Sequence, residues 1–159
     1  MVVRGHVNAM NSEQPPEHRD LRDVRVQDLV ARTGIDEAMI RTLVHAFYGR
    51  VRADETLGPI FAAEVEDWDA HLGTLVDFWS SIALMTARYD GRPMPAHVKL
   101  DVGEAHFARW LELFRETARE VCTPEAAQFF IGKAETIARS FQMGIAFHRS
   151  QPPQPRPPE

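Results

Sequence analysis

The sequence predicts an all-α fold for this chain of 159 residues. In four segments, apolar residues recur three and four positions apart, which places them along one side of a helix. No run of alternating apolar residues is long enough to indicate a sheet. Because each predicted helix has one apolar face, the helices must cover one another's apolar faces around a shared core.

The first two predicted helices lie before residue 54. A short helix is expected from Val26 to Ala31, ending near Gly34. Asp36 can cap a second helix, because its carboxylate can accept from the free amides of the first turn. The apolar side of this second helix is formed by Met39, Leu43, Ala46, Phe47 and Val51, with Val44 and Tyr48 beside it.

A turn and a long helix are expected next. Gly58 and Pro59 interrupt the segment Leu57 to Phe61, which predicts a tight turn or a single helical turn that directs Ile60 and Phe61 inward. From Asp67 a helix of about 30 Å is predicted. Its buried face comprises Trp68, His71, Leu72, Leu75, Trp79, Ile82, Ala83 and Thr86.

The remaining two helices lie in the last third of the chain. Gly103 opens one of them, with an inward face of Phe107, Trp110, Leu111, Phe114, Ala118 and Val121. Thr123 caps the other, and proline follows at its first helical position. The apolar residues of this last helix are Phe130, Ala134, Ile137, Phe141 and Ile145.

The stretch from Tyr89 to Gly103 is broken by two prolines. Pro93 and Pro95 each lack an amide donor and restrict the preceding residue, so no long helix is expected there. His97 therefore lies on a brief, rigid, apolar segment, which suits the fixing of one imidazole. A single histidine in such surroundings is ordinarily a core or surface residue without a metal.

Composition narrows the choice of function. The 44% of apolar residues is ordinary for one globular domain, and a net charge of -5 without a Lys/Arg block argues against nucleic acid or a membrane surface as partner. Cys122 is the only cysteine, so neither an intrachain disulfide nor a cysteine zinc site is possible, and we expect it to be a small buried apolar residue. With no signal-like start and no stretch of about 18 apolar residues, a cytoplasmic protein is expected.

The two ends differ in composition from the rest. Residues 1–25 are largely polar and carry Pro15 and Pro16, and five prolines occur in the last nine residues. We predict a disordered N-terminal extension over 1–25, one domain over 26–148 and a disordered Pro-rich tail over 149–159.

If the apolar faces meet, they enclose four polar ring side chains: Tyr48, His71, His97 and Trp110. The apolar residues expected around them are Phe47, Phe61, Leu75, Trp79 and Phe107. An apolar pocket with few polar groups is typical of a cofactor site, and its two histidines suggest a metal. Tyr48 and Trp110 can equally be core aromatics whose polar atoms bond to nearby acceptors.

The residues argue against two kinds of metal site and suit a third. A structural zinc site needs further His or Cys ligands at close spacing, and none accompanies His71 or His97. A di-iron bundle needs Glu followed three residues later by His on two helices, which the sequence does not offer. Haem iron suits one fixed imidazole and an opposite side with hydrogen-bond donors, although periodicity alone does not establish it.

The order of these residues resembles the group III truncated haemoglobins. The resemblance runs from about Ile35 to Phe147 and rests on Phe47-Tyr48, Val51-Arg52, Leu57 to Phe61, Trp68 with His71, Phe78-Trp79, Tyr89 with Gly91 and Pro93, His97 with Leu100, and Phe107 with Trp110-Leu111 and Leu113-Phe114. It implies a truncated globin fold, the two-over-two helical sandwich around haem b. His97 would be the proximal iron ligand, and Tyr48, His71 and Trp110 would line the distal side.

The resemblance also implies further contacts with haem. Phe61 would pack on the haem plane, and Phe47, Leu75, Trp79 and Phe107 would complete the pocket. His71 can point into the pocket, swing outward as a gate, or only pack. Arg92, Lys99 and Arg139 are candidates for the propionates, although a solvated face is the commoner place for a basic residue.

Two classes of function follow from a five-coordinate haem iron that binds dioxygen, nitric oxide or carbon monoxide. Two strong donors polarise bound dioxygen, which favours nitric oxide dioxygenation or peroxidase-like chemistry. Such turnover requires a separate reductase, because the chain has no flavin or nicotinamide fingerprint. The alternative is a non-catalytic protein that stores, senses or delivers the ligand, and a helical interaction module without cofactor is the least specific possibility.

Overall fold

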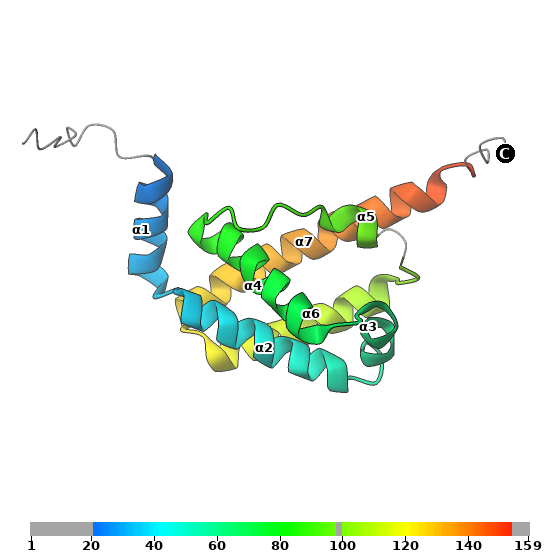
Figure 1. Ribbon diagram of the computed structural model, residues 1–159, viewed down its shortest axis with the longest axis horizontal. Helices are drawn as coiled ribbons and strands as arrows, with labels where there is room; N and C mark the ends of the chain where they lie inside the picture. Colours follow the sequence, from blue (N-terminus) through cyan, green and yellow to red (C-terminus); the bar gives the residue numbers. More distant parts are fainter. Residues whose placement is uncertain (1–20, 98–99, 154–159) are drawn as a thin grey trace, which may run out of the picture.

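The computed structural model describes residues 21–97 and 100–153, and within these ranges the chain is helical with no strand, so the all-α prediction is confirmed (Figure 1). The helices of the described residues are α1 (Leu21–Thr33), α2 (Glu37–Ala53), α3 (Gly58–Glu64), α4 (Trp68–Leu84), α5 (Pro93–His97), α6 (Glu104–Val121) and α7 (Pro124–Ser150). In the part of the chain that is described, no helix combines the length and the apolar character that crossing a membrane requires.

Four helices form the body of the molecule in two pairs. α2 packs against α4, α6 packs against α7, and the contact between α2 and α6 joins the pairs. This is the two-over-two arrangement that the resemblance implies. In Figure 1, α1 stands away from this body at one end and α5 lies along α7.

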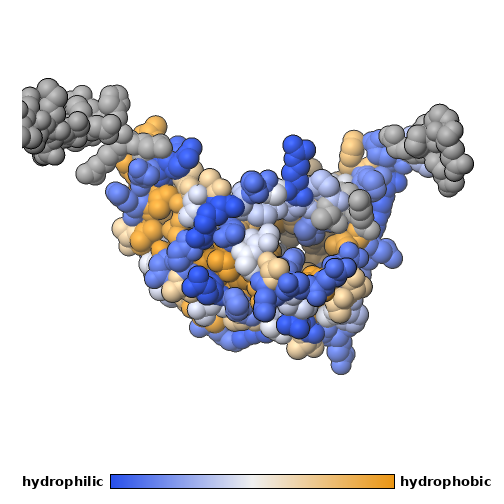
Figure 2. Space-filling view, viewed as in Figure 1, coloured by the Kyte–Doolittle hydropathy of each residue, from blue (hydrophilic) through white to orange (hydrophobic). Residues whose placement is uncertain are grey.

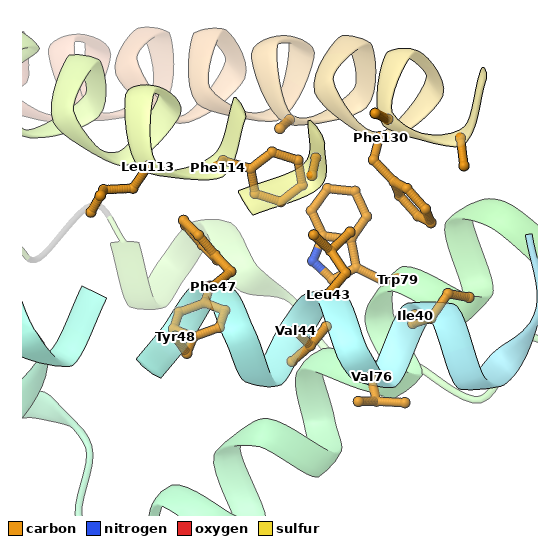
Figure 3. Packing of buried hydrophobic residues seen from close by; sticks show 14 of the residues in the cluster. Ile40, Leu43, Val44, Phe47, Tyr48, Val76, Trp79, Leu113, Phe114 and Phe130 are labelled. Carbon is orange, nitrogen blue, oxygen red and sulfur yellow. The ribbon is translucent and has the colours of Figure 1, made fainter. Parts of the chain in front are cut away.

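A cluster of aromatic rings packs in the core between the two pairs (Figure 3). Trp79 of α4 stacks on Phe114 of α6, with ring centroids 5.3 Å apart and planes at 26°. Phe130 of α7 meets Trp79 edge-on at 5.9 Å, and Phe47 of α2 meets Phe114 edge-on at 5.0 Å. These four rings come from four different helices, so the helices share one core. Burying one such side chain contributes about 1.5 to 3 kcal/mol.

Side-chain caps start three of the main helices at the predicted positions. The carboxylates of Asp36 and Asp67 accept from the amides of Met39 and Ala70 at 2.8 and 3.1 Å. The hydroxyl of Thr123 accepts from the amide of Ala126 at 3.2 Å and donates to the carbonyl of Thr33 at 2.6 Å. The start of α7 is therefore tied to the end of α1.

The helix α1 is longer than predicted. It begins at Leu21 rather than Val26, with Asp23 in its first turn and Arg32 in its last, where their charges stabilise the helix dipole. It ends before Gly34, whose φ of 74° lies in the left-handed region that glycine adopts without strain. Since α7 runs to Ser150, the predicted limits of the domain, 26 and 148, both fall inside helices. Residues 1–20 and 154–159 of the two predicted disordered segments lie outside the described residues.

The connection from α4 to α5 is held by polar contacts. The guanidinium of Arg88 donates to the carboxylate of Glu37 at 2.8 Å and to the buried hydroxyl of Ser80 at 2.7 Å. The amide of Tyr89 donates to Ser81 at 3.0 Å. These contacts direct the chain back across α4, and the helix that follows has only five residues, as the prolines predict.

Candidate functional site

A cavity of about 580 Å³ lies between the helix pairs, and its wall is mostly apolar. Figure 2 shows a hollow on the face turned to the viewer. The volume is that of a cofactor or ligand pocket, which spans about 300 to 1,000 Å³. The helices α2 to α7 all contribute to the wall, together with the α3–α4 and α5–α6 connections.

The residues predicted for the site come together in this cavity, with one exception. Its wall includes Tyr48, Phe61, His71, Leu75, Trp79, His97, Phe107 and Trp110. Phe47 does not line the cavity, because its ring points into the aromatic core, where it is 1% exposed. It lies behind the wall and touches Tyr48 and Trp110 edge-on.

Tyr48 is a deeply buried polar side chain of the wall, with 5% of its surface exposed. Its ring lies edge-on to Phe61 of α3 at 5.8 Å and to His71 of α4 at 6.1 Å between centroids. Burial raises the pKa of its hydroxyl well above the ordinary value, and the hydrogen bond from Trp110 acts in the opposite direction without cancelling the rise. The hydroxyl therefore stays protonated and can donate a hydrogen bond into the cavity.

The indole of Trp110, on α6, lies beside Tyr48 in the cavity wall. It stacks on Phe114 with centroids 5.5 Å apart and planes at 22°, while Phe47 meets it edge-on. The stacking leaves the ring little freedom to turn. Its N–H is a donor only and bonds to the hydroxyl of Tyr48 in this structure, so the O–H of Tyr48 stays available to donate, and the two side chains bring two donors to one part of the cavity.

His71 is half-buried on the same side. Its ring lies edge-on to Trp68 at 5.7 Å as well as to Tyr48. Burial lowers the pKa of this imidazole, and the charge that His97 can carry lowers it further. His71 is consequently neutral at pH 7, and it is a third polar group next to Tyr48.

Asp54 fixes the position of two helices that carry this side of the cavity. Its carboxylate accepts from the amides of Thr56 and Leu57, at 3.1 and 3.0 Å, just before α3, and from Arg109 of α6 at 2.8 Å. The amide of Leu57 is the largest of the influences that hold the pKa of Asp54 below its usual range. Arg109 directly precedes Trp110, so one carboxylate aligns α2, α3 and α6.

His97 lies apart from this group, on α5. Its Nδ1 is 2.6 Å from the carbonyl oxygen of Pro93, and since a carbonyl only accepts, Nδ1 carries the proton and donates. The other ring nitrogen, Nε2, then has a free lone pair. A hydrogen bond that fixes one nitrogen of an imidazole while the other binds a metal is the usual arrangement of metal-binding histidines.

Several groups at the site were not predicted from the sequence. Phe141 of α7 stacks on His97, with centroids 4.2 Å apart and planes at 13°. The sequence places Phe141 on the apolar side of the last helix, but nothing local indicates which segment covers it. The Pro93 carbonyl could have been found, because it lies four residues before His97, as a helical hydrogen bond requires. His106 also lines the cavity, and its Nδ1 accepts from the amide of Gly103 at 2.9 Å.

The three basic residues that were candidates for the haem propionates do not share one position in the structure. Arg92 lines the cavity, while Arg139 is exposed and does not. Lys99 lies outside the described residues. Carboxylates of Glu64, Glu66 and Asp67 line the wall near the α3–α4 connection.

The donor set of this cavity fits haem. It offers one imidazole with a fixed tautomer, a mostly apolar wall with flat aromatic rings, and a separate group of hydrogen-bond donors. A metal with four protein ligands would need more nitrogen or sulfur donors around His97, whereas haem brings four of its own.

Comparisons with known proteins agree with this geometry. The family model described as "Bacterial-like globin" matches residues 30–140. The chain is 33% identical over 113 residues to "Group 3 truncated hemoglobin ctb" of Campylobacter jejuni, an alignment that covers 68% of this chain and 89% of that protein. The crystal structure of group III truncated hemoglobin from Campylobacter jejuni superposes with a TM-score of 0.67 at 32% identity, covering 70% of this chain and 91% of the other.

The matched segment includes nearly all of the cavity wall. Among the residues that line the cavity, Phe141 alone lies after residue 140, and the match with the family model begins inside α1. The agreement therefore covers the site itself and the helices that form it.

Proposed function

The chain belongs to the bacterial-like globin family and, within it, to the group III truncated haemoglobins, and we propose that it holds haem b with His97 as its one protein bond to iron. The observation that carries this proposal is the hydrogen bond from Nδ1 of His97 to Pro93. It leaves Nε2 of this cavity-lining imidazole unprotonated, so that this nitrogen would be the one to hold the iron. Haem, when bound, supplies the iron at which a diatomic ligand is held.

The proposed roles of the other side chains follow from their polarity and position. The hydroxyl of Tyr48 and the indole N–H of Trp110 donate hydrogen bonds to the oxygen atoms of a ligand on the distal side. The apolar rings of Phe61 and Phe107 exclude water and cover the faces of the cofactor. His71 controls access, because it is half-buried next to Tyr48 and can turn about its first torsion.

We favour oxygen or nitric oxide redox chemistry over transport. Two donors that converge on one ligand stabilise negative charge on it, which slows release and favours reaction with a second molecule. Nitric oxide dioxygenation and peroxidase-like chemistry both fit this charge. Either reaction needs a separate reductase as partner, since the family fold and the sequence supply no electron donor.

Stopped-flow mixing of the oxygenated protein with nitric oxide tests this choice. A stoichiometric yield of nitrate, followed by repeated turnover when a reductase and NADH or NADPH are added, supports an enzyme. Nitrate formation that ends after one equivalent with every reductase supplied, together with reversible oxygen binding, favours a protein that senses or stores the ligand.

A further inference from the structure

The short helix α5 is held in place by one neighbouring helix. Among the described elements, α5 makes its helix contacts with α7 (Figure 1). The chain on its N-terminal side is a long irregular connection, and Val98 and Lys99 on its other side lie outside the described residues. The position of His97 in the cavity is therefore set largely by how α5 rests on α7.

A glycine on α7 allows the two helices to approach. A Cβ atom at Gly144 would meet the Sδ of Met94 and lie 3.0 Å from its Cε. Met94 follows Pro93, the residue whose carbonyl accepts from His97. A larger residue at position 144 would force the end of the Met94 side chain to move from its place against α7.

One turn earlier on α7, Phe141 determines the plane of the imidazole. The two rings are nearly parallel, with a centroid distance of 4.2 Å that lies at the short end of aromatic contacts. The bond from Nδ1 to Pro93 fixes the direction of one ring nitrogen but permits the ring to tilt about that bond. Stacking on Phe141 removes that freedom, so Nε2 points in one direction.

We propose that Phe141 and Gly144 of α7 are positioning residues for His97 and set the strength of its bond to iron. This inference rests on the proposed function, because it concerns the axial ligand of the same site. Phe141 acts through the plane of the imidazole ring, and Gly144 acts by leaving room for the Met94 side chain against α7. Both residues lie after the segment that the family model matches, so they are features of this chain beyond that match.

The test compares two variants with two matched controls in the haem-loaded, full-length protein. Phe141→Leu keeps an apolar side chain but removes the flat ring, and its control is Phe147→Leu, at a 68% exposed position of the same helix. Gly144→Val fills the contact with Met94. Its control is Gly132→Val on α7, where a Cβ atom meets nothing within 4 Å.

Two measurements report on the iron bond rather than on folding. One is the iron–imidazole stretching band of the ferrous, unliganded protein by resonance Raman spectroscopy, and the other is the rate of haem transfer to excess apomyoglobin. We expect the band to shift in both variants and haem loss to accelerate about tenfold, as expected for losing one aromatic contact. The two controls should keep the parent band and a transfer rate within about twofold of the parent. Combining Gly144→Val with Met94→Ala should restore the parent band, because the added bulk then fits.

The outcomes separate this inference from the function on which it rests. If both Phe141→Leu and Gly144→Val kept the iron–imidazole band of the parent, the positioning role would be overturned, while haem binding would stand. A parent protein without an iron–imidazole band would overturn the proposed function and this inference together. Should one variant not retain its helical circular dichroism, the other variant decides.

Discussion

The ring of Phe47 lies edge-on to the indole of Trp110, with centroids 5.3 Å apart and planes at 85°. The same ring meets Tyr48 at 4.8 Å and 70°. One buried phenylalanine therefore supports both donors of the cavity, and the orientation of each depends on the aromatic core behind it. Because these donors are held in advance, they can stabilise charge on a ligand without reorganising.

We expect replacement of either donor to speed the release of dioxygen. A hydrogen bond to a partly charged acceptor contributes about 1.5 to 3 kcal/mol, so Tyr48→Phe or Trp110→Phe should raise the dioxygen dissociation rate about 10- to 150-fold. Carbon monoxide carries less charge, so its dissociation should change less. Stopped-flow displacement of each ligand measures both rates.

Trp68→Phe is the control for this pair of variants. Trp68 is a half-buried indole that contacts Tyr48 and His71 but does not line the cavity. Its loss should leave dioxygen dissociation within about threefold of the parent. Rates for Tyr48→Phe and Trp110→Phe that both stay within about twofold of the parent would exclude them as donors to the ligand.

The rate of ligand access should depend on pH through His71. A charged imidazole is costly inside an apolar cavity, so protonation should favour an outward, hydrated position. Because burial lowers the pKa of His71, most of the acceleration should occur below its ordinary value of about 6.5, as pH falls from about 8 to 5. Flash photolysis of the carbon monoxide complex across this range measures the rate.

Substitutions of two histidines identify the titrating group. His71→Leu should make the rate nearly independent of pH, whereas His106→Leu removes the other histidine of the wall outside α5 and should retain the parent profile. The remaining titratable side chains of the wall are Tyr48, Glu64, Glu66, Asp67, Tyr89, Arg92 and His97. Equal pH profiles in the parent and His71→Leu would exclude the gate.

A single backbone position offers a test of stability. Ala87, in the connection from α4 to α5, has a φ of 58° and an exposed side chain. Relieving the left-handed conformation outweighs the entropy of an added glycine, so Ala87→Gly should raise the free energy of unfolding by about 1 kcal/mol. The same change at the exposed helical residue Ala108 should lower it by about 1 kcal/mol. Urea unfolding at pH 7 measures both changes in the free energy of unfolding. Two changes of the same sign would contradict this reasoning.

The features that the sequence predicts well are those that depend on neighbouring residues. The caps predicted at Asp36 and Thr123 are confirmed, because a cap needs only its own first turn, and the helix predicted from Asp67 begins there with a cap as well. The predicted start of α1, Val26, is wrong by more than one helical turn, since the sequence gives little indication of where a helix without a strong cap begins. The apolar stripes predicted that the helices pack against one another, which is confirmed, whereas their arrangement in two pairs was implied by the family resemblance.

Contacts between distant segments could not be predicted in the same way. Phe47 and Tyr48 are consecutive and both apolar in character, yet the helical turn between them sends one into the core and the other to the cavity. The stacking of Phe141 on His97 joins residues on two helices, α7 and α5, that also meet where Met94 lies against Gly144. Only the three-dimensional arrangement of α5 and α7 reveals that contact.

The absorption spectrum of His97→Ala, taken with and without added imidazole, tests the haem site most directly. The parent protein, purified after expression with sufficient haem, should give ferrous and carbon monoxide spectra of a haem bound through one imidazole. His97→Ala should lose haem on gel filtration and regain the parent spectra when imidazole occupies the space that the side chain leaves. An unchanged ferrous spectrum in His97→Ala without imidazole would contradict the assignment of His97 as the iron ligand.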